Sequence, residues 1–190
     1  MKKIPTIYTR DWDGDPKYVT REPDPSCAWV FAGEGKPTRK YDGTCVRFDG
    51  QTWWARREVK PGRPEPAGFE IVDEDAETGK RMGWEPSDAT GFFRFLVEAA
   101  GGEGQLYDWL PGTYELCGPK INRNPEGYAE HRLVRHDAAD SIEVRALTWE
   151  GIRATVLAGA ADGIEGIVWH HDDGRMAKIK ARDFPRAQDE

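Results

Sequence analysis

The sequence predicts an α+β fold with mostly antiparallel sheets and flanking helices. Three observations lead to this class: short runs that suit strands recur along the chain, helical patterns are few, and strands and helices do not alternate strictly. Frequent glycines and prolines, 21 and 13 of them, keep these runs short. Because a typical domain holds about 100–200 residues, we expect residues 1–190 to form a single domain.

Strand patterns are clearest in three segments. Thr44 to Arg57 is typical of two strands joined at Asp49-Gly50, a dipeptide that suits a tight hairpin turn. Gly112 to Cys117 predicts a further strand. Ile164 to Trp169 and Met176 to Lys180 predict a second hairpin across an Asp-Asp-Gly turn. Hairpins of this kind pair their strands antiparallel.

Two segments predict helices. The first is expected to start near Ser87, where serine or aspartate can cap it, and to run to Ala100. Gly101 can then end it, since glycine is common just beyond a helix C-terminus. The second is expected over Thr148 to Ala158.

Composition excludes several classes of protein. No run approaches the roughly 20 apolar residues that span a bilayer, and no signal segment opens the chain. We therefore expect a soluble, cytoplasmic protein without a membrane partner. The three cysteines are too scattered for a disulfide framework, and the four histidines have no partners at metal-ligand spacing. A net charge of −7 argues against a wide phosphate-binding surface but leaves room for a local basic pocket.

The first candidate for chemistry is Lys40-Tyr41-Asp42-Gly43, which precedes the first predicted hairpin. A lysine of ordinary pKa, near 10.4, is neutral only to about 0.04% at pH 7, so a nucleophilic lysine needs neighbouring cations or desolvation. Taken alone, the tetrapeptide is equally typical of a surface lysine before an Asp-Gly turn.

The second candidate is Lys178-Ile179-Lys180 on the last predicted strand. Alternation along a strand sends both ammonium groups to one face, about 7 Å apart, where they suit a phosphate chain. Glu165 opens the partner strand, and a carboxylate there could hold a divalent cation or accept a proton. A solvated strand face with an ordinary glutamate is the simpler alternative.

The third candidate is Glu115, which lies among apolar neighbours in Tyr114-Glu115-Leu116-Cys117-Gly118. A buried carboxylate is costly unless it is paired or hydrogen-bonded. A ribose hydroxyl would satisfy it, and so would a backbone amide.

The order of these motifs is more specific than any one of them. Lys-x-Asp-Gly is followed by an Arg-bearing strand, by Glu-Leu-x-Gly, by Glu-Gly-Ile-Val and by Lys-x-Lys. This succession resembles the covalent nucleotidyltransferase superfamily of DNA ligases, RNA ligases and mRNA-capping enzymes. The wider strings around Trp29–Gly35, Gly118–Asn122 and Lys178–Phe184 look closer still to small stand-alone RNA ligases. The resemblance covers roughly residues 27 to 184.

The resemblance implies an adenylation domain of the ligase type and an ATP-dependent RNA ligase. Lys40 would attack the α-phosphorus of ATP and form a lysyl-AMP intermediate. AMP would pass to the 5′-phosphate of an RNA strand, and a 3′-hydroxyl would displace it. Lys178 and Lys180 would act with Lys40 by gripping the α-phosphate. Glu165 would complete the catalytic set by binding Mg²⁺ or Mn²⁺.

Five further residues are implied as nucleotide contacts. Asp42 is expected to orient Lys180 by an ion pair, and Glu115 to hold the ribose hydroxyls. Arg56 would contact the ribose or an incoming strand end, and Val168 would pack against adenine. Many members carry arginine where this chain has Cys45, and Arg47, two residues on, would take over the terminal-phosphate contact.

Three other functions remain open from the sequence. A DNA ligase or a guanylyltransferase of the capping type would use the same lysine. A nucleotide-binding module without turnover would keep the same motifs. The chain ends shortly after Lys180, and we expect no separate oligonucleotide-binding domain, which favours the small RNA ligase.

Overall fold

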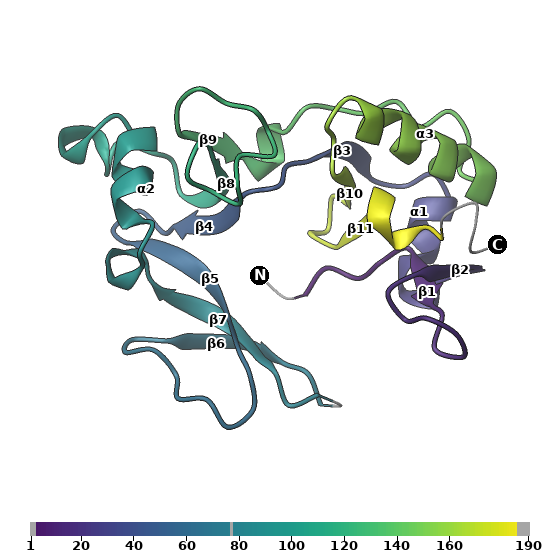
Figure 1. Cartoon of the computed structure of the whole chain (residues 1–190), viewed down its shortest axis with the longest axis horizontal. Coiled ribbons are helices and arrows are strands. Elements are labelled where there is room, and N and C mark those ends of the chain that lie inside the picture. Colours follow the sequence, from purple (N-terminus) through teal and green to yellow (C-terminus); the bar gives the residue numbers. More distant parts are fainter. Residues whose placement is uncertain (1–2, 77, 186–190) are drawn as a thin grey trace. The chain divides into compact units, whose positions relative to one another are not determined.

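The computed structural model describes residues 3–76 and 78–185, and Figure 1 shows the course of the chain. The chain divides into two compact units. Among the described residues, the first holds residues 3, 42–76 and 78–138, and the second holds residues 4–41 and 139–185. The boundary between Tyr41 and Asp42 cuts through the Lys-x-Asp-Gly tetrapeptide, so Lys40 and Asp42 belong to different units. The expected single adenylation domain stays a prediction.

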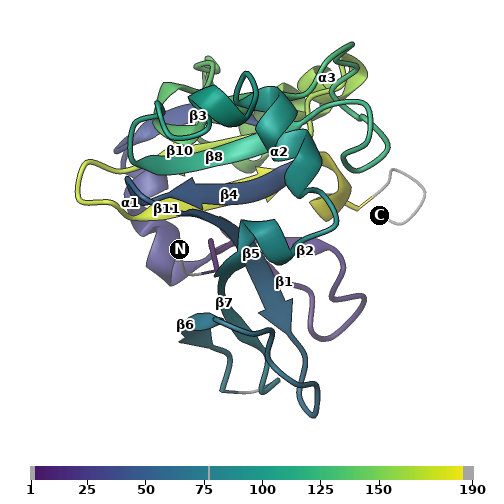
Figure 2. The same ribbon diagram turned by 90° about the vertical axis from the view of Figure 1, so that its left-hand side faces the viewer.

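The first unit is built on a six-stranded sheet in which every neighbouring pair is antiparallel. Its strand order is β6-β7-β5-β4-β8-β9. The strands are β4 (Thr44–Phe48), β5 (Trp53–Val59), β6 (Glu70–Glu74), β7 (Arg81–Pro86), β8 (Gly112–Cys117) and β9 (Arg132–Arg135). Figure 2 shows β4 and β8 side by side with α2 (Phe93–Ala99) against them.

Alternation along these strands separates an apolar face from a polar face. Val46, Phe48, Tyr114 and Leu116 are buried and pack with Leu96 of α2 in one core cluster. Truncating a fully buried leucine such as Leu96 typically costs about 2–5 kcal/mol. The residues between them on β4 and β8 therefore face the other way, and these carry the polar groups described below.

The second unit contains two smaller antiparallel sheets. One pairs β1 (Tyr8–Arg10) with β2 (Val19–Pro23). The other has the order β11-β10-β3 and consists of β3 (Lys36–Lys40), β10 (Gly166–His170) and β11 (Met176–Lys180). The helices of this unit are α1 (Ala28–Phe31) and α3 (Trp149–Ala161).

The core of the second unit lies between α3 and the β11-β10-β3 sheet (Figure 1). Ile152 and Val156 of α3 pack in one cluster with Ile167 and Trp169 of β10 and with Ile179 of β11. Since these strand residues alternate with those of the opposite face, one face of this sheet is apolar and covered. The lysines of the sequence motifs lie on the other face.

Five short 3-10 turns complete the described chain. They are η1 (Pro25–Cys27), η2 (Ser87–Ala89), η3 (Glu103–Gln105), η4 (His136–Ala138) and η5 (Ala181–Asp183).

The predicted α+β class with mostly antiparallel sheets is confirmed, and so are both predicted hairpins and the strand Gly112–Cys117. The second predicted helix is confirmed as α3, which Thr148 caps by accepting the N–H of Gly151.

The predicted start of the first helix near Ser87 is wrong. Residues there form only the turn η2, because Thr90 adopts an extended backbone (ψ 150°) and interrupts the helical path. The helix begins at Phe93 instead. Its expected end is confirmed, since Gly101 takes a positive φ of 97° that favours glycine.

Within the stretches 3–76 and 78–185, no helix has both the length and the apolar character that a membrane crossing requires.

Candidate active site

Lys40 and Lys180 flank one glycine in the three-stranded sheet. Gly166 of β10 lies directly opposite Lys180 on β11 and directly opposite Lys40 on β3. Residues that face each other across antiparallel strands point to the same side of the sheet. The two lysines therefore share the face that α3 does not cover.

Gly166 is required here because its neighbour strand passes too close for a side chain. A Cβ at this position would lie 2.1 Å from the carbonyl oxygen of Ile179 and 2.8 Å from the Cα of Lys180. Both are backbone atoms, which cannot move aside as the end of a side chain can. Only glycine therefore allows β11 to pass this close to β10 beside the two lysines.

The carboxylate of Glu165 joins the two lysines. Its Oε2 lies 2.5 Å from Nζ of Lys40, and its Oε1 lies 2.5 Å from Nζ of Lys180. Only 12–19% of each of these three side chains is exposed. A guanidinium nitrogen of Arg182 lies 3.8 Å from the same Oε1. One ionised carboxylate is thus surrounded by three cations, which leaves the cluster with a net positive charge.

This setting fixes the charge of Glu165. Burial is the largest single influence and would raise the pKa of its carboxyl group, but the Lys40 charge and the hydrogen bonds from Lys180 and Lys40 together outweigh it. The pKa of Glu165 is therefore held below its ordinary value of 4.5. At neutral pH the residue is an anion that is a poor proton acceptor.

Val168 and Lys178 lie one step further along the same sheet face. They oppose each other across β10 and β11, and Val168 also opposes Thr38 on β3. Strict alternation would have put Val168 and Glu165 on opposite faces. The structure shows no register shift in β10: Glu165 precedes the strand, and its side chain still reaches the lysines.

Glu115 is satisfied by two partners within the first unit. Its Oε1 accepts the backbone N–H of Gly43 at 3.1 Å, and its Oε2 lies 3.0 Å from Nε2 of His136. The sequence analysis allowed a backbone amide as a partner of Glu115, and the N–H of Gly43 is such a partner. Its side chain is 12% exposed, so the two contacts offset much of the cost of burying a carboxylate.

Asp42 and Gly43 are fixed by residues of the same unit. The Asp42 backbone N–H donates to Oε1 of Glu126, and the Asn122 side-chain amide donates to Asp42 Oδ1 and to the Gly43 carbonyl, at 2.8, 3.2 and 2.6 Å. Asn122 begins a run of three non-glycine residues with positive φ, an uncommon backbone conformation that marks this loop as locally strained.

Arg47 lies on the polar face of the six-stranded sheet. Its guanidinium group packs over the rings of Trp54 and Trp84, at 5.2 and 4.9 Å, and pairs with Glu70 at 3.2 Å. Arg56 opposes Trp84 across β5 and β7 and belongs to the same face.

The predicted site residues thus fall into two groups, one in each unit. Five belong to the second unit: Lys40, Glu165, Val168, Lys178 and Lys180. The other four belong to the first unit: Asp42, Arg47, Arg56 and Glu115. Within the second unit, Lys180 pairs with Glu165. The ion pair expected between Asp42 and Lys180 stays a prediction, because these residues belong to different units.

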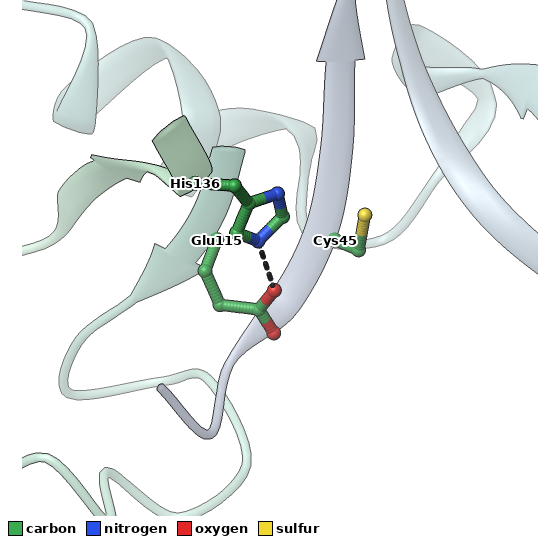
Figure 3. A group of neighbouring side chains, drawn as sticks. All are labelled: Cys45, Glu115 and His136. Atoms are coloured by element: carbon green, nitrogen blue, oxygen red, sulfur yellow. Dashed lines mark hydrogen bonds and ion pairs between the residues drawn. The ribbon is translucent and has the colours of Figure 1, made fainter. Parts of the chain in front are cut away.

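His136, Cys45 and Asn122 were missed as site residues by the sequence reasoning. The histidines had seemed to lack metal-binding partners, yet ligand atoms of Cys45, Glu115 and His136 all lie within 4.8 Å of one another (Figure 3). Sequence spacing could not reveal this cluster, because Cys45 and His136 are brought to Glu115 by pairing of β8 with both β4 and β9.

Comparison with known proteins gives two relatives and no matching family model. A protein of Danio rerio named RNA ligase 1 is 31% identical over 150 residues, which make up 67% of this chain and 45% of that protein. A protein of Pongo abelii, also named RNA ligase 1, is 36% identical over 80 residues, or 39% of this chain and 24% of that protein. The chain spans less than half the length of the curated relatives it matches.

Proposed function

We propose that this chain is the adenylation domain of an ATP-dependent RNA ligase, which joins 5′-phosphate and 3′-hydroxyl ends through a lysyl-AMP intermediate. The observation that carries this proposal is the cluster of Lys40, Glu165 and Lys180 around Gly166. The similarity to two proteins named RNA ligase 1 supports RNA as the nucleic acid that is joined.

Lys40 is the proposed nucleophile. Its ammonium group, which contacts Glu165, first loses one proton to solvent. The resulting amine attacks the α-phosphorus of ATP, a nitrogen–phosphorus bond forms, and the bond from that phosphorus to the β-phosphate oxygen breaks. Pyrophosphate leaves, and the second proton lost from Nζ passes to solvent. A covalent intermediate of this kind divides one difficult transfer into easier ones.

Lys178 and Lys180 are proposed to stabilise the charge that develops on the α-phosphate. They lie on the same face of the sheet as Lys40, and cations fixed in advance cost no reorganisation during the reaction. Val168, which lies between Thr38 and Lys178 on this face, is the proposed packing surface for the adenine ring.

Glu165 is proposed to position Lys40 and Lys180 rather than to take the proton. Its lowered pKa makes it a weak base, while its two oxygens contact both ammonium groups. A carboxylate oxygen suits Mg²⁺ or Mn²⁺ in principle. Here, however, both oxygens already contact ammonium groups and Arg182 lies nearby, so a metal ion would add further positive charge to a cluster that is already net positive. The surroundings of Glu165 therefore do not fit a metal ion.

The later steps follow from the same intermediate. AMP moves from Lys40 to the 5′-phosphate of an RNA strand, and the phosphoramidate bond breaks as the new phosphoanhydride forms. A 3′-hydroxyl then attacks the activated phosphate, and AMP leaves with the anhydride oxygen. The nucleotide and strand-end contacts assigned to residues of the first unit stay predictions: Asp42, Arg47, Arg56 and Glu115.

Joining of RNA tests this function directly. The purified chain is incubated with ATP, with Mg²⁺ or Mn²⁺, and with a labelled RNA that carries a 5′-phosphate and a 3′-hydroxyl. We expect circular or joined RNA from the wild type and none from Lys40→Ala. Lys36→Ala is the matched control, since Lys36 lies exposed on the same strand and should be dispensable.

Substrate choice then separates the alternatives. Activity with GTP but not ATP would favour a guanylyltransferase, and joining of nicked duplex DNA but not RNA would favour a DNA ligase. ATP binding without release of pyrophosphate would favour a nucleotide-binding module. Any of these three results would overturn the RNA ligase proposal.

A further inference from the structure

Three different metal-ligating groups meet on the polar face of the six-stranded sheet. Cys45 on β4 lies directly opposite Glu115 on β8. His136 follows β9, one step beyond the pairing of Arg135 with Tyr114, and so arrives beside Thr113 and Glu115. The thiol, carboxylate and imidazole ligand atoms all lie within 4.8 Å of one another (Figure 3).

The cluster is partly buried and held in place. The Glu115 and His136 side chains are 12% and 23% exposed, and Cys45 is of intermediate burial. Cys45 lies on β4 and His136 directly follows β9, so the pairing of both strands with β8 leaves these groups little freedom to separate. This distinguishes the cluster from exposed acidic groups that gather at a surface by chance.

His136 is oriented as a metal ligand would be. Its Nδ1 lies 2.9 Å from Thr113 Oγ1, and its Nε2 lies 3.0 Å from Glu115 Oε2. Metal-binding histidines almost always bond through their second nitrogen to a neighbouring group, which fixes the ring. A carboxylate oxygen and an imidazole nitrogen this close need a proton or a metal ion between them.

The same contacts argue against a cysteine nucleophile. A catalytic Cys–His pair needs an imidazole nitrogen within hydrogen-bond reach of the thiol. In this structure Nδ1 of His136 contacts Thr113 and Nε2 contacts Glu115. The three groups therefore match a ligand set better than a catalytic triad.

We propose that Cys45, Glu115 and His136 bind one divalent transition-metal ion of the zinc type. Thiolate and imidazole ligands favour such ions, whereas Mg²⁺ prefers oxygen alone. Ligand bonds of about 2.0–2.3 Å in a tetrahedron place ligand atoms about 3.5 Å apart. Atoms within 4.8 Å reach that spacing by small side-chain rotations. Three protein ligands leave the fourth coordination position open for water or for a small molecule that binds to the protein.

This site does not depend on the proposed ligase function. It uses residues of the first unit alone, and Gly43 keeps its bond to the other carboxylate oxygen, Oε1 of Glu115. It does share Glu115 with the predicted ribose contact. Metal binding is therefore measured without ATP or RNA, so that failure of either inference is recognised separately.

Titration of Zn²⁺ and Co²⁺ into the chelator-treated chain tests the site. We expect one ion per chain, and a thiolate-to-cobalt charge-transfer band in the Co²⁺ absorption spectrum. Cys45→Ser should abolish that band, and His136→Gln should weaken binding at least about tenfold. Cys27→Ser, which removes a buried thiol of the second unit, should bind as the wild type does.

Thr113 provides a second measurement that leaves all three ligands in place. Thr113→Val should weaken Zn²⁺ binding about 10- to 100-fold by releasing the His136 ring, and Thr113→Ser should restore it. The proposal is overturned if the wild type binds neither ion, if binding survives Cys45→Ser unchanged, or if bound Co²⁺ shows no thiolate band.

Discussion

Replacing Glu165 by glutamine tests how the lysine cluster is held together. The change keeps the size of the side chain and one acceptor oxygen but removes the negative charge that both Lys40 and Lys180 contact. Two ammonium groups, with Arg182 close by, would then share a small region without their anion. We expect Glu165→Gln to destabilise the fold at neutral pH.

The size of the loss follows from opposing contributions. A single contact between opposite charges at about 4 Å is worth roughly 4 kcal/mol at an effective dielectric constant near 20. Removing the charge also removes the cost of burying it, which offsets much of that attraction. Breaking a fully buried pair costs about 3–5 kcal/mol. Because these side chains keep 12–19% exposure, we expect a smaller loss of unfolding free energy than for a fully buried pair, about 1–3 kcal/mol.

The pH dependence has a definite sign. The pKa of Glu165 is lower in the folded chain than its ordinary value of 4.5. A group with a lowered folded pKa stabilises the fold fully above the unfolded pKa, and this contribution is lost as the pH falls through the folded pKa. The difference in stability between wild type and Glu165→Gln should therefore be constant from pH 7 to above pH 5 and shrink below about pH 4.5.

Urea denaturation between pH 7 and pH 3 measures this difference. Glu143→Gln is the control, because Glu143 belongs to an ion pair that is largely exposed and should matter by less than about 0.5 kcal/mol. Equal unfolding midpoints for Glu165→Gln and wild type at pH 7 would refute the reasoning. A difference that stays unchanged at pH 3 would refute the assigned charge.

Three further substitutions test close backbone packing at two glycines and the cap of one helix. Gly166→Ala should lower the free energy of unfolding by about 1–3 kcal/mol and slow AMP transfer, because the added Cβ would lie 2.1 Å from the Ile179 carbonyl oxygen. Gly91→Ala is the control and should do neither, because a Cβ at Gly91 would meet no atom within 4 Å. Equal urea midpoints for these two variants would contradict the close approach. Gly43→Ala should also destabilise, because its Cβ would lie 2.3 Å from a backbone oxygen of β8, and an unchanged midpoint would count against that packing. Thr148→Ala should cost about 1 kcal/mol through loss of the α3 cap, whereas a loss near zero would show that the cap is dispensable.

Local patterns in the sequence predicted much of the fold. Hairpins at residues 44–57 and 164–180 follow from alternation around turn residues, and the structure confirms both. The helix near Ser87 was placed too early because a single serine can cap a helix or form a tight turn, and Thr90 selects the turn. Strand β3 was not predicted, because it pairs with β10, a strand distant in sequence.

Strand alternation also predicted part of the candidate site. Alternation places Lys178 and Lys180 on one face, and the structure agrees with it. The opposition of Lys40 to Gly166 depends on which strand pairs with β10, and this cannot be derived from spacing. Glu165 contacts the two lysines from a position just before β10, outside any strand, so strand alternation does not predict this contact. The cluster of Cys45 and His136 with Glu115 likewise depends on the strand order.

The mass of the intact chain after incubation with ATP and a divalent metal ion tests the central claim most directly. Wild type and Lys36→Ala should each gain the mass of one AMP, and Lys40→Ala should gain none. Peptide mapping should place the added group on Lys40. An adduct that persists in Lys40→Ala, or no adduct on the wild type despite measurable ATP binding, would contradict the account.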